Sequence, residues 1–102
     1  MTKAEKLFHD IAEGIPKATE GKMFGALCFK APSGKSAAMY WKECLVVKLE
    51  AKDVAVAMKL KGAKHFDPMG GRPMKEWVQI PFVHSKEWKS FSEKAMKYIT
   101  KK

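Results

Sequence analysis

Apolar residues recur at helical spacing in three segments of the chain. Thr2 and Glu5 form a capping box before the first segment, which predicts a helix over residues 3–14. A second, shorter helix is predicted over residues 51–61, and a third begins at Ser85, which we expect to act as its cap. The apolar stripe of this last helix consists of Trp88, Phe91, Ala95, Tyr98 and Ile99. Lysines occupy its other side, so we expect it to pack with one face and to be basic on the opposite one.

Alternating or continuous apolar runs between these helices predict β-strands. Three of them, over residues 22–31, 36–42 and 44–49, follow one another through short turns and are expected to form an antiparallel meander. A short extended segment over residues 65–69 precedes a glycine-containing loop, and a further strand covers residues 77–82. The element order is therefore α-β-β-β-α-β-β-α.

That order, with local hairpins and no repeated β-α-β units, predicts an α+β fold. We expect a two-layer sandwich in which helices cover one face of an antiparallel sheet. Pro81 has no N–H to donate to a neighbouring strand, so the last strand should end there or lie at an edge. The 102 residues contain no linker or repeat, which predicts one domain over residues 1–102.

Positive charge is the strongest deviation in composition. The formal net charge is +9; residues 1–51 hold eight basic and six acidic side chains, and residues 52–102 hold twelve and five. A field of this sign attracts polyanions such as nucleic acid. Arg72 is the only arginine, and bidentate reading of guanine favours arginine over lysine, so nucleic-acid binding is expected to be non-specific.

The sequence offers no catalytic or metal-binding constellation. His9, His65 and His84 lie far apart without a partner at metal-ligand spacing, and Cys28 and Cys44 match neither a metal site nor a redox pair. Lysines interrupt every apolar stretch, and the first residues do not form a secretion signal. We therefore expect a soluble, cytoplasmic, non-enzymatic protein with no cofactor, no metal and no catalytic residue.

Four short motifs resemble a known family. Residues 22–25 (Lys-Met-Phe-Gly) open a strand, Gly34 and Lys35 form a turn, and the stretches 62–68 and 71–81 complete the pattern. Over nearly the whole chain this sequence resembles the N-terminal domain of the TfoX/Sxy family. The resemblance implies the same two-layer architecture, a link to the regulation of natural competence and to nucleic acid, and no enzymatic activity. Full-length regulators of that family carry a second, C-terminal domain, so we expect a stand-alone N-terminal-like domain here.

Two features are candidates for contacting an anion. Gly70 and Gly71, with Arg72 and Lys75 nearby, would expose backbone N–H groups and two cations to a phosphate. The loop lacks the spacing of a phosphate-binding loop, so the alternative is that its glycines satisfy turn geometry. Tryptophans also lie among lysines, a combination that single-strand binders use to stack bases. The alternative, strongest for Trp88 on its apolar stripe, is that they build the core.

The leading hypothesis is a TfoX-like module whose basic surface meets nucleic acid. The residues expected at that surface are Arg72, Lys75, Lys86, Lys89 and Lys97. The alternative is a protein-interaction or self-association module, a homodimer included, in which exposed strand edges pair with another chain and the lysines only maintain solubility. A third hypothesis is a small-ligand sensor that uses the glycine loop.

Overall fold

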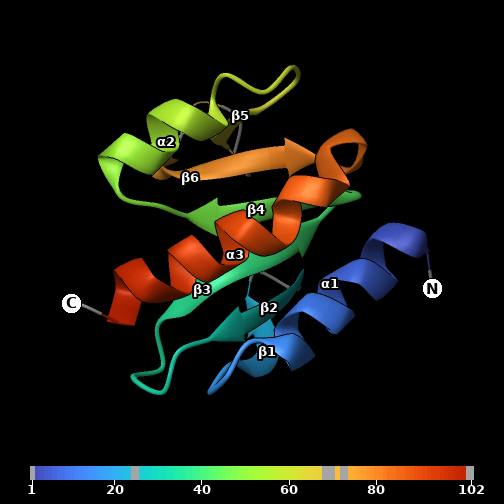
Figure 1. Ribbon diagram of the computed structural model, residues 1–102, viewed down its shortest axis with the longest axis vertical. Helices are drawn as coiled ribbons and strands as arrows, with labels where there is room; N and C mark the ends of the chain where they lie inside the picture. The colour runs from blue at the N-terminus through green and yellow to red at the C-terminus, as the bar shows by residue number, and fades with distance from the viewer. Residues whose placement is uncertain (1, 24–25, 68–70, 72–73, 101–102) are drawn as a thin grey trace.

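A computed structural model of the chain describes residues 2–23, 26–67, 71 and 74–100. Figure 1 shows its helices and strands. They are α1 (Lys3–Gly14), β1 (Thr19–Met23), β2 (Ala26–Lys30), β3 (Ser36–Trp41), β4 (Cys44–Lys48), α2 (Ala51–Ala57), β5 (Lys64–Phe66), β6 (Met74–Pro81), a 3₁₀ turn (Phe82–His84) and α3 (Ser85–Thr100).

The strands form one sheet, and the helices form a layer against it. The strand order is β1-β2-β3-β4-β6-β5, and each neighbouring pair is antiparallel. In Figure 1, α1 and α3 cross in front of the sheet, and α2 lies beside β6, against which it packs. The predicted α+β fold, an antiparallel sheet with helices packed on it, is confirmed.

The strand predicted over residues 22–31 is in fact two strands. β1 and β2 pair antiparallel from Thr19 opposite Lys30 to Met23 opposite Ala26. The prediction failed because a continuous apolar run at 23–29 looks the same whether the chain continues or reverses within it. Residues 19–21, which precede the predicted strand, also belong to β1, and the described sheet gains an edge strand.

Helix boundaries follow the prediction at α1 and differ at the other two helices. The N–H of Glu5 donates to Thr2 Oγ1 at 3.1 Å, which confirms Thr2 as the cap of α1. α2 ends at Ala57, earlier than predicted, because the amides of Lys59 and Leu60 bond three residues back and tighten the chain into turns. Ser85 is the first residue of α3 and continues directly from the 3₁₀ turn, so it lies inside the helix and not before it.

Both faces of the sheet bury apolar side chains. The larger core lies between helices and sheet and includes Phe8, Leu45, Val47, Ile80 and Trp88, all fully buried. Trp88 Nε1–H donates to the carbonyl of Pro81, the last residue of β6, at 3.2 Å. A smaller cluster on the other face consists of Cys28, Met39, Val46, Phe66 and Trp77. The predictions that Trp88 belongs to the core and that the strand ends at Pro81 are confirmed.

Candidate anion-binding site

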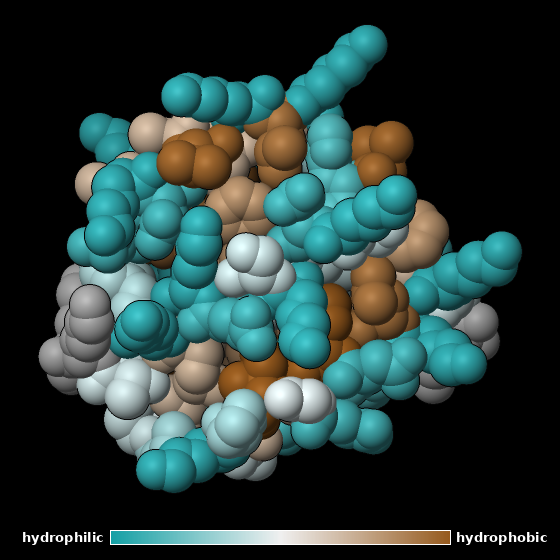
Figure 2. All heavy atoms as spheres, viewed as in Figure 1, coloured by the Kyte–Doolittle hydropathy of each residue, from teal (hydrophilic) through white to brown (hydrophobic). Residues whose placement is uncertain are grey.

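The predicted lysines of the last helix lie on its solvent side. Lys86, Lys89 and Lys97 are exposed on α3, and Figure 2 shows hydrophilic side chains over much of this helix-bearing face. A rise of 1.5 Å per residue separates the first and last of them by about 16 Å along the axis. Glu93 projects from the same helix, and Lys94 pairs with Asp53, with Nζ and Oδ1 3.9 Å apart. This surface therefore mixes cations with carboxylates.

The other predicted residues are only partly described. Lys75 is exposed on β6 and lines a small hollow with Tyr98, the neighbour of Lys97 on α3. Arg72 and Gly70 lie outside the described residues. The N–H of Gly71 donates to both carboxylate oxygens of Asp67, at 3.1 and 2.9 Å. An anion at that N–H would meet the charge of a carboxylate already bonded to it, which favours the turn interpretation of this glycine.

A different group of lysines gathers around one hollow of about 420 Å³. Its lining, which we call the lysine hollow, consists of Lys22, Lys30, Lys35 and Lys48 with Gly34, Ser36 and Trp77. The four ammonium groups come from β1, β2, the β2–β3 turn and β4, and no carboxylate is among the lining residues. A hollow with this lining is suited to an anion.

The meander β2-β3-β4 brings these residues to one end of the sheet. Lys30 ends β2 and is paired with Ser36 at the start of β3, while Lys48 ends β4 and is paired with Trp77 on β6. The turn between β2 and β3 closes with the N–H of Gly34 donating to the carbonyl of Ala31 at 2.9 Å. Gly34 has φ +89°, a conformation that glycine adopts without strain. The hairpin geometry thus concentrates charge that is dispersed in the sequence.

Most of the ammonium and hydroxyl groups of the lysine hollow are available to a ligand. Glu76 lies beside it, with Oε2 3.8 Å from Lys48 Nζ, and its other oxygen accepts from the hydroxyl of Tyr98 at 2.8 Å. Lys30 extends across β1, because a Cβ placed on Gly21 would lie 3.7 Å from its Nζ. The hydroxyl of Ser36 is buried without a hydrogen-bond partner among the described residues. The hollow can therefore offer several ammonium groups to phosphate oxygens.

The sequence-based interpretation missed the lysine hollow. All four lysines precede residue 51, in the half of the chain with the smaller net charge, and charge counted by halves hides their convergence. The signal that would have found them was the predicted meander, because Lys30 and Lys48 end alternate strands, which run in the same direction. Placing lysines on the predicted strands would have brought these two together.

Two of the histidines and one of the cysteines have polar partners among the described residues, whereas Nδ1 of His65 is buried without one. His9 Nδ1 lies 2.5 Å from a carboxylate oxygen of Glu20, and His84 Nε2 lies 2.7 Å from the carbonyl of Lys61. Cys28 is buried, and Cys44 Sγ accepts from Gln79 Nε2 at 3.5 Å. Within the ranges that the structure describes, no group of three His, Cys, Asp or Glu side chains could hold a metal ion.

The remaining tryptophans differ in their exposure. Trp77 is 7% exposed, and Trp41 is half-buried with its ring edge-on to Phe66 at 5.4 Å between centroids. The ammonium of Lys42 lies 5.6 Å from the centroid of Trp41, so a cation already occupies one side of this ring. Of these two rings, Trp41 is therefore the more accessible for stacking.

Two further observations concern the whole described chain. None of its described helices combines the length and apolar character needed to cross a bilayer. The motifs at residues 22–25 and 71–81 fall in or beside β1 and β6, two strands that line the lysine hollow. Comparisons of the chain with profiles of known protein families, with curated proteins and with solved structures give no match.

Proposed function

We propose that the chain is a cytoplasmic, non-enzymatic, TfoX-like module that binds nucleic acid through its phosphates. The observation that carries the proposal is the lysine hollow, which four lysines line without a carboxylate among the lining residues. Lysine contacts to phosphate supply affinity but carry no sequence information, so binding is non-specific. The role in natural competence that the family resemblance implies is part of this same proposal.

The lysine hollow is a better candidate for this contact than the outer face of α3. Lys30 and Lys48 are each only partly exposed on neighbouring parts of a sheet, which limits the conformations available to their side chains. The lysines of α3 are exposed along a single helix and alternate with Glu87 and Glu93. Ordered cations of one sign lose less entropy on binding than mobile ones, so the hollow should dominate affinity.

A titration across a salt series tests the proposal. Nuclease-treated protein is added to labelled DNA duplex, single-stranded DNA or RNA, and fluorescence anisotropy is measured at several salt concentrations. Four phosphate contacts predict a slope of log K against log salt of about −3.6 for duplex and about −2.8 for a single strand. Absence of binding to every probe at low salt, or binding that does not respond to salt, would contradict the proposal.

The alternative is a protein-interaction or self-association module. The observation in its favour is that β1 and β5 each have one neighbour in the described sheet, so each presents a free strand edge. Such edges can pair with another chain, although Lys22 on β1 is typical of edges that resist pairing. Sedimentation at low and high salt separates the two functions, since edge pairing persists when phosphate contacts are screened.

A further inference from the structure

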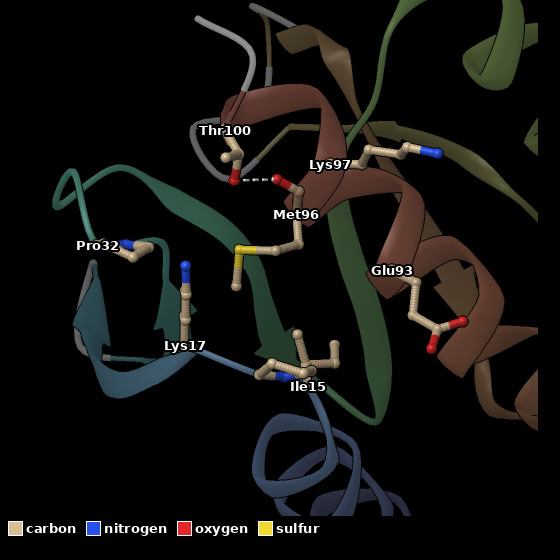
Figure 3. Close-up of a pocket in the computed structure, with 8 residues that line it drawn as sticks. Ile15, Lys17, Pro32, Glu93, Met96, Lys97 and Thr100 are labelled. Carbon is tan, nitrogen blue, oxygen red and sulfur yellow. Dashed lines mark hydrogen bonds between the residues drawn. The ribbon is translucent and has the colours of Figure 1, made fainter.

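A second concave site lies at the C-terminal end of α3. The connection between α1 and β1 contributes Lys17 to it. A groove of about 610 Å³ opens where the α1–β1 connection, the β2–β3 turn and the last turns of α3 meet (Figure 3). Its walls are largely apolar and include Ile15, Pro32 and Met96. This volume lies in the range of about 300–1,000 Å³ that is typical of small-molecule sites.

The side chains around this groove differ in direction. In Figure 3 the ammonium of Lys17, the thioether of Met96, the ring of Pro32 and the side chain of Ile15 surround one space. The side chains of Glu93 and Lys97 point away from it. Lys17 is therefore the charged group that faces an apolar space.

The ammonium of Lys17 has no ion pair or hydrogen bond with any other described residue. Its backbone has φ +67°, the left-handed region that lysine rarely adopts. Pro16 precedes it, and the N–H of Ala18 donates to the carbonyl of Ile15 at 3.2 Å, so the connection is a tight turn. This turn directs a lysine into the groove at a position where glycine would be less strained.

The end of α3 does not cancel this charge. The last turn of a helix carries partial negative charge on carbonyls that lack intrahelical partners. Here the hydroxyl of Thr100 donates to the carbonyl of Met96 at 2.6 Å, as the dashed line in Figure 3 shows, but this carbonyl lies one turn before the end of α3 and is not one of the terminal carbonyls. The full positive charge of Lys17 exceeds this partial charge, which amounts to about half an elementary charge.

We propose that this groove binds a small amphipathic carboxylate, such as a medium-chain acyl anion. The acyl chain would lie against Ile15, Pro32 and Met96, and the carboxylate would pair with the ammonium of Lys17. A neutral apolar ligand would desolvate this ammonium without giving it a partner, and a cationic amphiphile would be repelled. The flexible thioether of Met96 can adapt to chains of different length. This site is separate from the lysine hollow and does not depend on nucleic-acid binding.

Calorimetric titration with octanoate and decanoate, below their micelle concentrations, tests the proposal, with decanol and decylammonium as head-group controls. We expect saturable binding of decanoate, up to about fourfold tightening for each added CH₂, and decanoate at least about tenfold tighter than decylammonium. No saturable binding of decanoate by about 1 mM, or equal affinity for all three head groups, would overturn the proposal.

Two substitutions locate the ligand. Lys17→Met removes the ammonium and keeps the length of the side chain, and Lys6→Met makes the same charge change on the exposed side of α1. We expect Lys17→Met to weaken decanoate binding about tenfold and to leave decanol binding unchanged or tighter, because no ammonium is then desolvated, whereas Lys6→Met leaves both unchanged. Decanol binding that is not weakened also shows that the variant is folded. Equal effects of the two substitutions on decanoate would reject Lys17 as the recognition group, and with it the proposal.

Discussion

Lys48 on β4 lies directly opposite Trp77 on β6, so a cation and an aromatic ring share one wall of the lysine hollow. The indole of Trp77 is 7% exposed and packs with Met39, Val46 and Phe66 in the smaller core cluster. A ring this buried cannot present its face to a base without partial unfolding. Contact at the hollow should therefore depend on phosphate charge, with little contribution from base stacking.

The first prediction compares two lysine pairs of equal charge. Replacing Lys30 and Lys48 together by Met should lower the slope of log K against log salt for duplex DNA by about 1.8, because two phosphate contacts are lost. Methionine keeps most of the apolar stem, so folding should be little affected. Anisotropy titration of this double variant across the salt series measures the change.

Lys86 and Lys89 provide the matched control. They are exposed on α3 and outside the lysine hollow, and their replacement by Met removes the same net charge. We expect a smaller loss of affinity, through the general field of the protein alone. If the α3 pair reduces the slope more than the Lys30–Lys48 pair, the contact lies on the helix-bearing face and the hollow is not the site.

The second prediction concerns the carboxylate beside the hollow. Glu76 Oε2 lies 3.8 Å from Lys48 Nζ and competes with phosphate for this ammonium. Glu76→Gln should tighten nucleic-acid binding about two- to fivefold, because a half-exposed ion pair contributes at most about 1 kcal/mol. The amide oxygen of glutamine can still accept from the hydroxyl of Tyr98, so folding stability should change little. Weaker binding of the variant at every salt concentration would contradict this interpretation.

The fold was predictable from the sequence where local patterns agree with tertiary packing. Thr2 caps α1 as the capping box indicated, and Trp88 is fully buried as its position on the apolar stripe indicated. The reversal between Met23 and Ala26 was missed, because residues 23–29 form a continuous apolar run with no polar position to mark it. In a continuous apolar run, β-strand propensity cannot distinguish one long strand from two strands joined in a hairpin.

The candidate site was less predictable than the fold. The lysines expected at the surface were chosen by regional charge, whereas Lys22 and Lys48 come together through pairing across several strands. A count of charge along the sequence does not show which distant lysines the fold brings together. Likewise, nothing in the sequence marks Lys17 as facing a groove, because its direction depends on a left-handed backbone conformation that lysine seldom adopts.

The third prediction uses a buried hydroxyl in α3. Ser92 is fully buried, and its Oγ has no hydrogen-bond partner among the described residues. Ser92→Ala should raise the free energy of unfolding by about 1–2 kcal/mol, since it removes an unsatisfied polar group and improves helix propensity. Urea denaturation should show a higher midpoint with an unchanged m-value.

Ser90 serves as the control for helix propensity. It lies two residues away on the exposed side of α3, so Ser90→Ala changes propensity without touching the core. We expect a gain of about 0.5 kcal/mol or less from this substitution. A loss of stability in Ser92→Ala would mean that its hydroxyl is satisfied in solution and that its removal leaves a costly void.

The fourth prediction concerns the two-residue turn between β3 and β4. Lys42 and Glu43 have φ of +47° and +67°, and the strands that they join pair at Trp41 and Cys44. Positive φ at both positions is the geometry of a type I′ turn, in which glycine is strongly preferred at the second position. Glu43→Gly should therefore raise the free energy of unfolding by about 0.5–1 kcal/mol, after allowance for the greater freedom of glycine in the unfolded chain.

Glu43→Ala removes the same charge but keeps the backbone strain, so it should give no such gain. Urea denaturation of the two variants separates strain from charge, and equal stabilisation by both would show that removal of the carboxylate, and not relief of the backbone, is responsible.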